Sequence, residues 1–153
     1  ATLNAGFAAA RKLDCGIVVT IDADGEHDPA ILTEFIKNLD KAPLVLGFRP
    51  RKQRFSEVVM GWYFKSRFGV NDILCGMKGY RISLYDENKG FDHIKSIGTE
   101  LAVNAIKRGH SFRQVPVSGH PRLGRPRFGS LIKGNWRIFQ ALFRVIALDV
   151  SRA

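Results

Sequence analysis

The sequence is poor in cysteine and lacks any long apolar run. Cys15 and Cys75 lie far apart without a neighbouring Cys or His pattern, which disfavours a cysteine-based metal site and fits a reduced, cytosolic setting. No run of 18 apolar residues occurs, so we expect no transmembrane helix. Residues 1–12 lack the basic start and apolar core of a signal peptide. The chain does not begin with Met, which indicates a fragment.

Acidic residues are scarce in the last third of the chain. Residues 101–153 hold 10 of the 24 Lys and Arg residues, but Asp149 is their single acid among 14 in the chain. This accounts for most of the net charge of +10. Such an asymmetry indicates an anionic partner, which could be nucleic acid, anionic lipid or a phosphorylated substrate. A solvated basic face is the alternative.

The remaining composition is that of one globular domain. The chain has 153 residues, of which 45% are hydrophobic and 25% charged. Hydrophobic periodicity and turn residues predict helices over residues 1–12, 29–39, 56–68, 100–108 and 130–149, and strands over 15–21, 44–48 and 112–117. The order strand, helix, strand across residues 15–48 predicts a parallel sheet with a crossover helix.

The first predicted strand delivers two carboxylates to its C-terminal end. Asp22 and Asp24 follow a β-branched run, at the place where open α/β sheets bind ligands. Gly25 permits a turn, and Pro29 suits the first turn of the next helix. Carboxylates this close repel unless a cation lies between them, which favours Mg²⁺ or Mn²⁺ bridging to a diphosphate. Alternatively, the two residues only cap the following helix.

The last predicted helix carries one apolar stripe. It consists of Ile132, Trp136, Phe139, Phe143, Ile146 and Val150, and Lys133, Arg137 and Arg144 flank it. A basic-flanked stripe with Trp and Phe is typical of a helix that lies in a membrane interface. Docking against the sheet would explain the same stripe, and the sequence leaves both readings open.

Four segments, in order, carry a resemblance to a known family. They are residues 3–10 (LNAGFAAA), residues 22–29 (DADGEHDP), Asp72 with residues 75–81 (CGMKGYR), and Glu100 with residues 115–117 (VPV) and 122–129 (RLGRPRFG). The chain resembles the inverting family 2 glycosyltransferases of the GT-A fold. Within them, it is most similar to the polyprenol-phosphate group, which includes the dolichol-phosphate mannose synthases. The resemblance covers residues 1–136.

The resemblance implies an α/β fold with a mostly parallel, Rossmann-like sheet and flanking helices. Residues 1–129 would form a GT-A domain that is incomplete at its N-terminus, and residues 130–153 a C-terminal amphipathic helix. The implied reaction moves a sugar from a UDP- or GDP-linked donor to a polyprenyl phosphate, with Mg²⁺ or Mn²⁺. The implied location is the cytoplasmic face of the cell membrane, where the protein contacts the membrane surface.

The resemblance also assigns roles to individual residues. Asp22, Asp24 and Glu26 would hold the metal, and Asp24 and Asp72 would act in catalysis, Asp72 by orienting or deprotonating the acceptor. An ionised phosphate acceptor needs positioning and charge compensation more than a strong base. Guanidinium groups suit that task because they fork onto phosphate oxygens. The substrate-binding set is Asp22, Glu26, Arg49, Arg67, Arg122, Arg125 and Arg127.

Two departures and two alternatives accompany this reading. The family's N-terminal strand and base-binding loop have no counterpart here, and Glu26 stands where the family usually has Gln. A family 2 transferase for another acceptor is one alternative, although residues 134–137 (GNWR) do not match the Gln-x-x-Arg-Trp motif of the polysaccharide-building enzymes. A non-catalytic basic module that binds membrane or nucleic acid is the other. No nucleic-acid-reading motif supports the nucleic-acid version.

Overall fold

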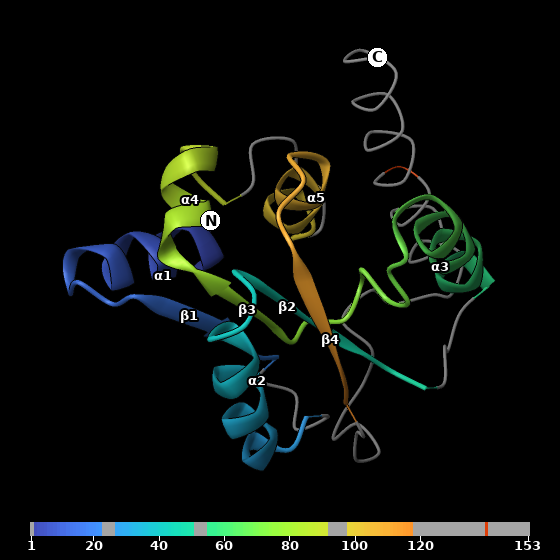
Figure 1. Cartoon of the computed structure of the whole chain (residues 1–153), viewed down its shortest axis with the longest axis horizontal. Helices are drawn as coiled ribbons and strands as arrows, with labels where there is room; N and C mark the ends of the chain where they lie inside the picture. Colours follow the sequence, from blue (N-terminus) through green and yellow to red (C-terminus); the bar gives the residue numbers. More distant parts are fainter. Residues whose placement is uncertain (1, 23–26, 51–54, 92–97, 118–139, 141–153) are drawn as a thin grey trace.

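The computed structural model describes residues 2–22, 27–50, 55–91, 98–117 and 140. Its elements follow the order α1 (Thr2–Lys12), β1 (Ile17–Thr20), η1 (Pro29–Ile31), α2 (Leu32–Leu39), β2 (Leu44–Phe48), α3 (Phe55–Phe68), β3 (Lys78–Arg81), α4 (Ile82–Asn88), α5 (Glu100–Lys107) and β4 (Phe112–Pro116). Figure 1 shows this mixed α/β arrangement, with helices above and below a twisted sheet. The predicted α/β class is confirmed.

The described strands form one four-stranded sheet in the order β1-β3-β2-β4. β3 lies antiparallel between β1 and β2, whereas β2 and β4 pair in parallel. β1, β2 and β4 therefore run in one direction and β3 in the other. The predicted parallel sheet with a crossover helix across residues 15–48 is confirmed, because β1 and β2 run in the same direction in one sheet and α2 connects them. β3 lies between the two strands, so they do not pair directly.

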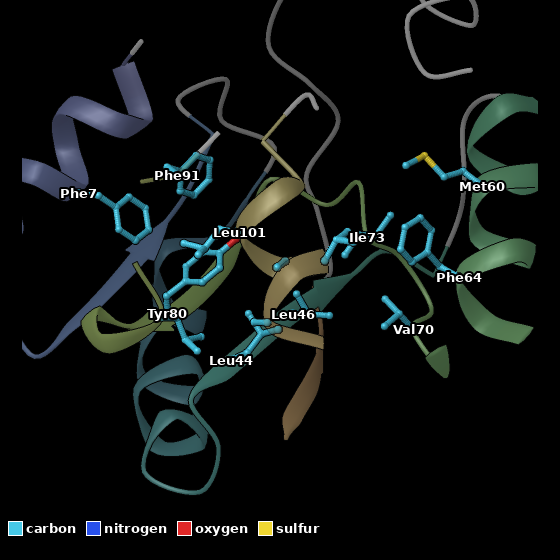
Figure 2. Close-up of a cluster of buried hydrophobic side chains, with 14 residues drawn as sticks. Phe7, Leu44, Leu46, Met60, Phe64, Val70, Ile73, Tyr80, Phe91 and Leu101 are labelled. Atoms are coloured by element: carbon cyan, nitrogen blue, oxygen red, sulfur yellow. The ribbon is translucent and has the colours of Figure 1, made fainter. Parts of the chain in front are cut away.

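The sheet separates two hydrophobic cores. Leu44 and Leu46 point to one face of β2 and Val45 to the other, as the two-residue period of a strand requires. The larger core joins β2 and β3 to α1, α3, α4 and α5, and its side chains include Phe7, Phe64, Tyr80 and Leu101 (Figure 2). The smaller core holds Phe35 and Leu39 of α2 together with Val45, Cys75, Met77, Val115 and Val117. The molecule is thus a three-layer α/β structure.

Most of the predicted elements are present within two or three residues of their expected bounds. The strand over residues 44–48 is confirmed at both ends. The predicted helix over 29–39 divides into η1 and α2, and the Asp28 carboxylate caps η1 by accepting from the Ala30 N–H at 2.9 Å. The sequence did not predict β3 or α4. The C-terminal helix predicted over 130–149 lies outside the described residues, apart from Gln140.

No helix in the described part of the chain is both long enough and apolar enough to cross a membrane.

Candidate active site

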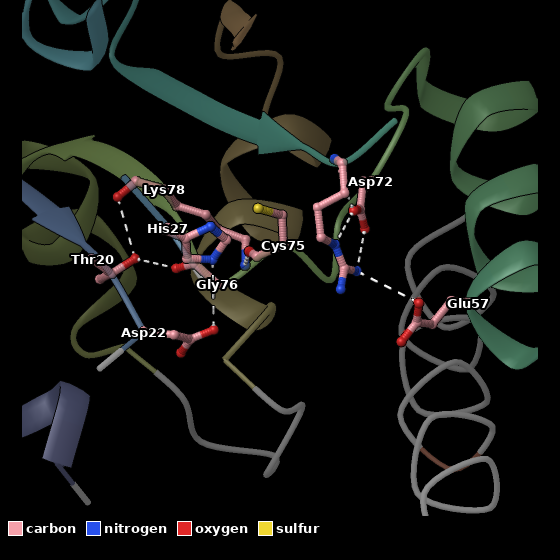
Figure 3. A network of polar contacts seen from close by, with 9 residues as sticks. Thr20, Asp22, His27, Glu57, Asp72, Cys75, Gly76 and Lys78 are labelled. Atoms are coloured by element: carbon pink, nitrogen blue, oxygen red, sulfur yellow. Dashed lines mark hydrogen bonds and ion pairs between the residues drawn. The ribbon is translucent and has the colours of Figure 1, made fainter. Parts of the chain in front are cut away.

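Asp22 lies two residues beyond β1, and its carboxylate rests on Gly76 (Figure 3). A Cβ on Gly76 would come 2.5 Å from the Asp22 Cγ and 2.9 Å from Oδ1, so a side chain at position 76 would occupy the space that the carboxylate fills. The Asp22 side chain is 45% exposed. The fold therefore presents one carboxylate to solvent at the predicted end of β1, on a wall that only glycine provides without displacement.

His27 lies beside this carboxylate. Its side chain is 2% exposed, and its Nε2 is 4.0 Å from the Asp22 Oδ2. Its buried Nδ1 has no hydrogen-bond partner in the described part of the structure. His27 thus covers one flank of Asp22 with a polar ring, a role that the sequence analysis did not assign to it.

A buried ion pair joins Arg49 to Asp72. The Arg49 Nε donates to the Asp72 Oδ2 at 2.8 Å, and the Arg49 Nη2 lies 3.3 Å from Oδ1 and 3.8 Å from the Glu57 Oε2. The Arg49 side chain is 18% exposed and that of Asp72 is 4% exposed. Burial lowers the pKa of Arg49, but the hydrogen bond and charge of Asp72 outweigh it and raise that pKa overall. Arg49 is therefore a permanent cation anchored by two acids.

Both carboxylate oxygens of Asp72 already accept hydrogen bonds. Oδ2 accepts from the Arg49 backbone N–H at 3.3 Å in addition to Nε, and Oδ1 accepts from the Leu74 N–H at 3.1 Å. A carboxylate bound in this way is poorly placed to take a proton from a substrate. Its geometry favours orientation of Arg49 and of the loop that begins at Asp72. The two roles that the sequence analysis gave Asp72, orienting or deprotonating the acceptor, stay predictions.

Lys78 is a site residue that the sequence analysis did not select. The residue is 4% exposed, and its Nζ donates to the Cys75 carbonyl at 2.6 Å. Burial lowers its pKa, and the nearby charges of Asp72 and Asp22 act in the opposite direction. Burial also raises the pKa of the neighbouring Cys75 thiol. The signal in the sequence was a lysine beside glycine in an apolar segment, which by itself does not distinguish a buried lysine from an exposed one.

The structure brings three of the predicted site residues together, and five others lie outside the described residues. Asp22, Asp72 and Arg49 belong to one polar region. The charge of each of them interacts with the Lys78 side chain. Arg67 is exposed at the end of α3, with its guanidinium carbon 5.2 Å from the Phe68 ring centroid. Asp24, Glu26, Arg122, Arg125 and Arg127 lie outside the described residues, so their roles stay predictions.

The part of the site that is described fits a hard divalent cation. Asp22 offers carboxylate oxygens of the kind that Mg²⁺ and Mn²⁺ prefer, and they are partly exposed and lie against Gly76. Within residues 2–22, 27–50, 55–91 and 98–117, no three His, Cys, Asp or Glu residues group closely enough to form a complete metal site. A cation at Asp22 would need further ligands from a bound diphosphate or from the predicted Asp24 and Glu26.

Solved structures define the fold as that of the GT-A glycosyltransferases. Glucosyl-3-phosphoglycerate synthase from Mycobacterium tuberculosis, bound to phosphoglyceric acid, superposes with a TM-score of 0.68 at 19% identity, over 92% of this chain and 53% of that one. The same enzyme bound to Mn²⁺, UDP and glucosyl-3-phosphoglycerate gives 0.67 at 18% identity, with the same coverage. Its complex with Mg²⁺ and UDP gives 0.69 at 20% identity, over 94% of this chain and 52% of that one.

The sequence relatives are glycosyltransferases as well. An uncharacterized glycosyltransferase from Mycobacterium tuberculosis and one from Mycobacterium bovis are each 34% identical to the chain over 133 residues. The match covers 80% of this chain and 59% of each relative. The chain therefore spans about three fifths of the length of these relatives. No protein-family profile matches it.

Proposed function

We propose that this chain is part of a glycosyltransferase that moves a sugar from a nucleotide-diphosphate donor to a polyprenyl phosphate, with Mg²⁺ or Mn²⁺. The observation that carries the proposal is the Asp22 carboxylate, which lies against Gly76 just beyond β1 and is 45% exposed. The glycosyltransferase relatives and the GT-A fold support it. We further propose that the protein works at the cytoplasmic face of the cell membrane, where such an acceptor would be embedded.

The proposed transfer exchanges one bond for another. A phosphate oxygen of the acceptor bonds to the anomeric carbon, the bond from that carbon to the donor diphosphate breaks, and the nucleoside diphosphate leaves with the electron pair. When bound, Mg²⁺ or Mn²⁺ would offset the charge that develops on this leaving group. Asp22 would hold the cation, and Arg49 would place a fixed positive charge close to the transferring groups.

The state of Asp72 supports a phosphate as the acceptor. A phosphate monoester is already ionised near neutral pH, so its oxygen attacks without losing a proton. An alcohol acceptor would need a general base. In the described part of the site Asp72 is the predicted base, and both of its oxygens are occupied by Arg49 and by backbone N–H groups. Because Asp72 is engaged in holding Arg49, an acceptor that needs no base fits the described contacts better than an alcohol does.

A small phosphorylated acceptor is the second candidate. The enzyme in the matched structures is a glucosyl-3-phosphoglycerate synthase, crystallised with phosphoglyceric acid or with glycerol 3-phosphate. Its likeness to this chain is below 25% identity and establishes the shared fold alone. The two candidates share a phosphate group and differ in whether a lipid accompanies it.

A transfer assay with paired acceptors tests the proposal. The purified chain is incubated with Mn²⁺ and radiolabelled UDP-glucose or GDP-mannose, either with polyprenyl phosphate in vesicles or with 3-phosphoglycerate. We expect label in the lipid phase, and its loss in Asp22→Asn. Asp28→Asn is the matched control, because the amide oxygen can still cap η1. Label in phosphoglycerate alone would establish the second candidate. No transfer together with no binding of Mn²⁺ and UDP would refute both and favour the non-catalytic basic module.

A further inference from the structure

The segment Cys75–Gly76–Met77, called here the Gly76 wall, is held at three successive carbonyls. The Lys78 Nζ donates to the Cys75 carbonyl at 2.6 Å. The Thr20 hydroxyl donates to the Gly76 carbonyl at 2.9 Å. The Gly47 N–H donates to the Met77 carbonyl at 3.0 Å. Two of these three donors are side chains, and Figure 3 shows Thr20 and Lys78 on the same side of Gly76, close to Asp22.

Lys78 lies on β3, directly after the Gly76 wall in the chain, and Thr20 lies on the neighbouring strand β1. They are register partners across the β1–β3 pair, and the Thr20 hydroxyl also lies 3.3 Å from the Lys78 carbonyl. Thr20 is two residues before Asp22 in the chain. The pair therefore connects the strand that carries the carboxylate to the segment on which that carboxylate rests.

A buried lysine is a costly way to satisfy one carbonyl. Removing an ammonium from water is strongly unfavourable, and an apolar side chain of similar volume is often as stable or more stable in its place. The charges of Asp22 and Asp72 interact favourably with the Lys78 ammonium, whereas Arg49 opposes it. Stability alone therefore gives a weak reason for a lysine here, whereas a nearby cluster of acids gives a specific one.

We propose that Lys78 and Thr20 are positioning residues that fix the Gly76 wall and thereby hold the Asp22 carboxylate in the geometry that binds the metal–diphosphate group. The inference rests on the proposed function. A site of this kind must hold its ligands within about 0.5 Å, which requires support from a second layer of residues. Lys78 acts through the Cys75 carbonyl and through its charge, and Thr20 acts through the Gly76 carbonyl.

Binding of Mn²⁺ together with UDP, measured by calorimetry, tests this inference. The first variant is Lys78→Met, which keeps the length of the stem and removes the ammonium. Its matched control is Lys37→Met, which makes the same change of charge at an exposed position on α2. The second comparison is Thr20→Val, which loses the hydroxyl, against Thr20→Ser, which keeps it. Thermal unfolding of each variant shows that binding is measured on folded protein.

We expect Lys78→Met to weaken Mn²⁺–UDP binding by roughly tenfold or more, in the range seen when outer-layer partners of metal ligands are removed. We expect Thr20→Val to weaken it by about threefold, and Lys37→Met and Thr20→Ser to bind as the wild type does. If Thr20 acted only by packing, Thr20→Val should bind Mn²⁺–UDP better than Thr20→Ser does, because valine matches the shape of threonine more closely than serine does. If Lys78→Met does not fold, the two threonine variants decide the question.

Wild-type affinity in both Lys78→Met and Thr20→Val would overturn the inference and leave the proposed function intact. If Thr20→Ser were as weak as Thr20→Val, the hydroxyl would not be the active group and the inference would fail. A wild-type chain that binds no Mn²⁺–UDP would refute the proposed function first, and this inference with it.

Discussion

Replacing Gly76 by alanine is the sharpest test of the candidate site. The new Cβ would lie 2.5 Å from the Asp22 Cγ, whereas non-bonded carbon atoms normally approach to about 3.5–4.0 Å. The carboxylate must therefore move by at least about 1 Å. Asp22 is 45% exposed, so it can turn toward solvent, and overpacking should cost only about 1–2 kcal/mol of stability. A displacement of about 1 Å in a reacting site costs on the order of 100-fold.

The expected result for Gly76→Ala is thus a large loss of function with a small loss of stability. Sugar transfer should slow by about two orders of magnitude, calorimetric titration of Mn²⁺ with UDP should show weakened binding, and the melting temperature should fall by only about 2–8 °C. Gly6→Ala is the control, because nothing lies within 4 Å of a Cβ there and alanine favours the helix α1. Undiminished Mn²⁺–UDP binding in folded Gly76→Ala would show that Asp22 does not act from the wall described above.

Three further outcomes follow from the buried polar groups. Arg49→Met leaves the Asp72 carboxylate buried without its cation and should lower the free energy of unfolding in urea by roughly 3–5 kcal/mol; a loss below about 1 kcal/mol would contradict a strong ion pair. Cys15 is exposed and should react with a thiol reagent at once, whereas burial, which also raises the pKa of the Cys75 thiol, should delay Cys75 until unfolding; equal rates in native protein would contradict this. Because burial lowers the pKa of Lys78 below its ordinary 10.5, the unfolded chain binds more protons between the two values; the stability of wild type relative to Lys78→Met should therefore rise with pH up to about 10.5, and a flat difference would contradict it.

The sequence predicted best the elements whose signal is local. The β-branched run before Asp22 and the apolar run Leu44–Phe48 are buried or half-buried strands bounded by turn residues, and both form as expected. Phe35 and Leu39 mark the buried side of α2 for the same reason. The position of Asp22 just beyond the end of β1 was also a local inference, because the strand determines where the next carboxylate lies.

β3 was missed because its strand character is not local. The segment Lys78–Arg81 contains a glycine and two cations, which individually disfavour a buried central strand. Its conformation comes from pairing on both sides, with β1 and with β2. A Cβ at Gly79 would lie 3.1 Å from the Leu39 Cδ1, which is tighter than ordinary van der Waals contact, and the two residues are 40 positions apart.

The ion pair of the site was unpredictable for a related reason. Arg49 was expected to bind phosphate and Asp72 to act on the acceptor, and their residue types allow both roles. Their separation of 23 residues carries no sign that the two side chains meet at 2.8 Å. Such long-range pairings are set by the topology, and nothing in the order of residues between them reveals the partner.

The central place of β3 has a consequence for how the protein forms. Asp22 follows β1, whereas Asp72, Gly76 and Lys78 lie within or just before β3, so the two halves of the site are 50 or more residues apart in the chain. They meet when β3 pairs with both β1 and β2, the pairing that joins β1 to the rest of the sheet. Bringing such distant segments together must offset loop-closure entropy first, so this is expected to be a late and slow event. A chain in which β3 has not yet inserted would have helices and separate strands but no site, so folding and the ability to bind a metal–nucleotide should appear at the same rate.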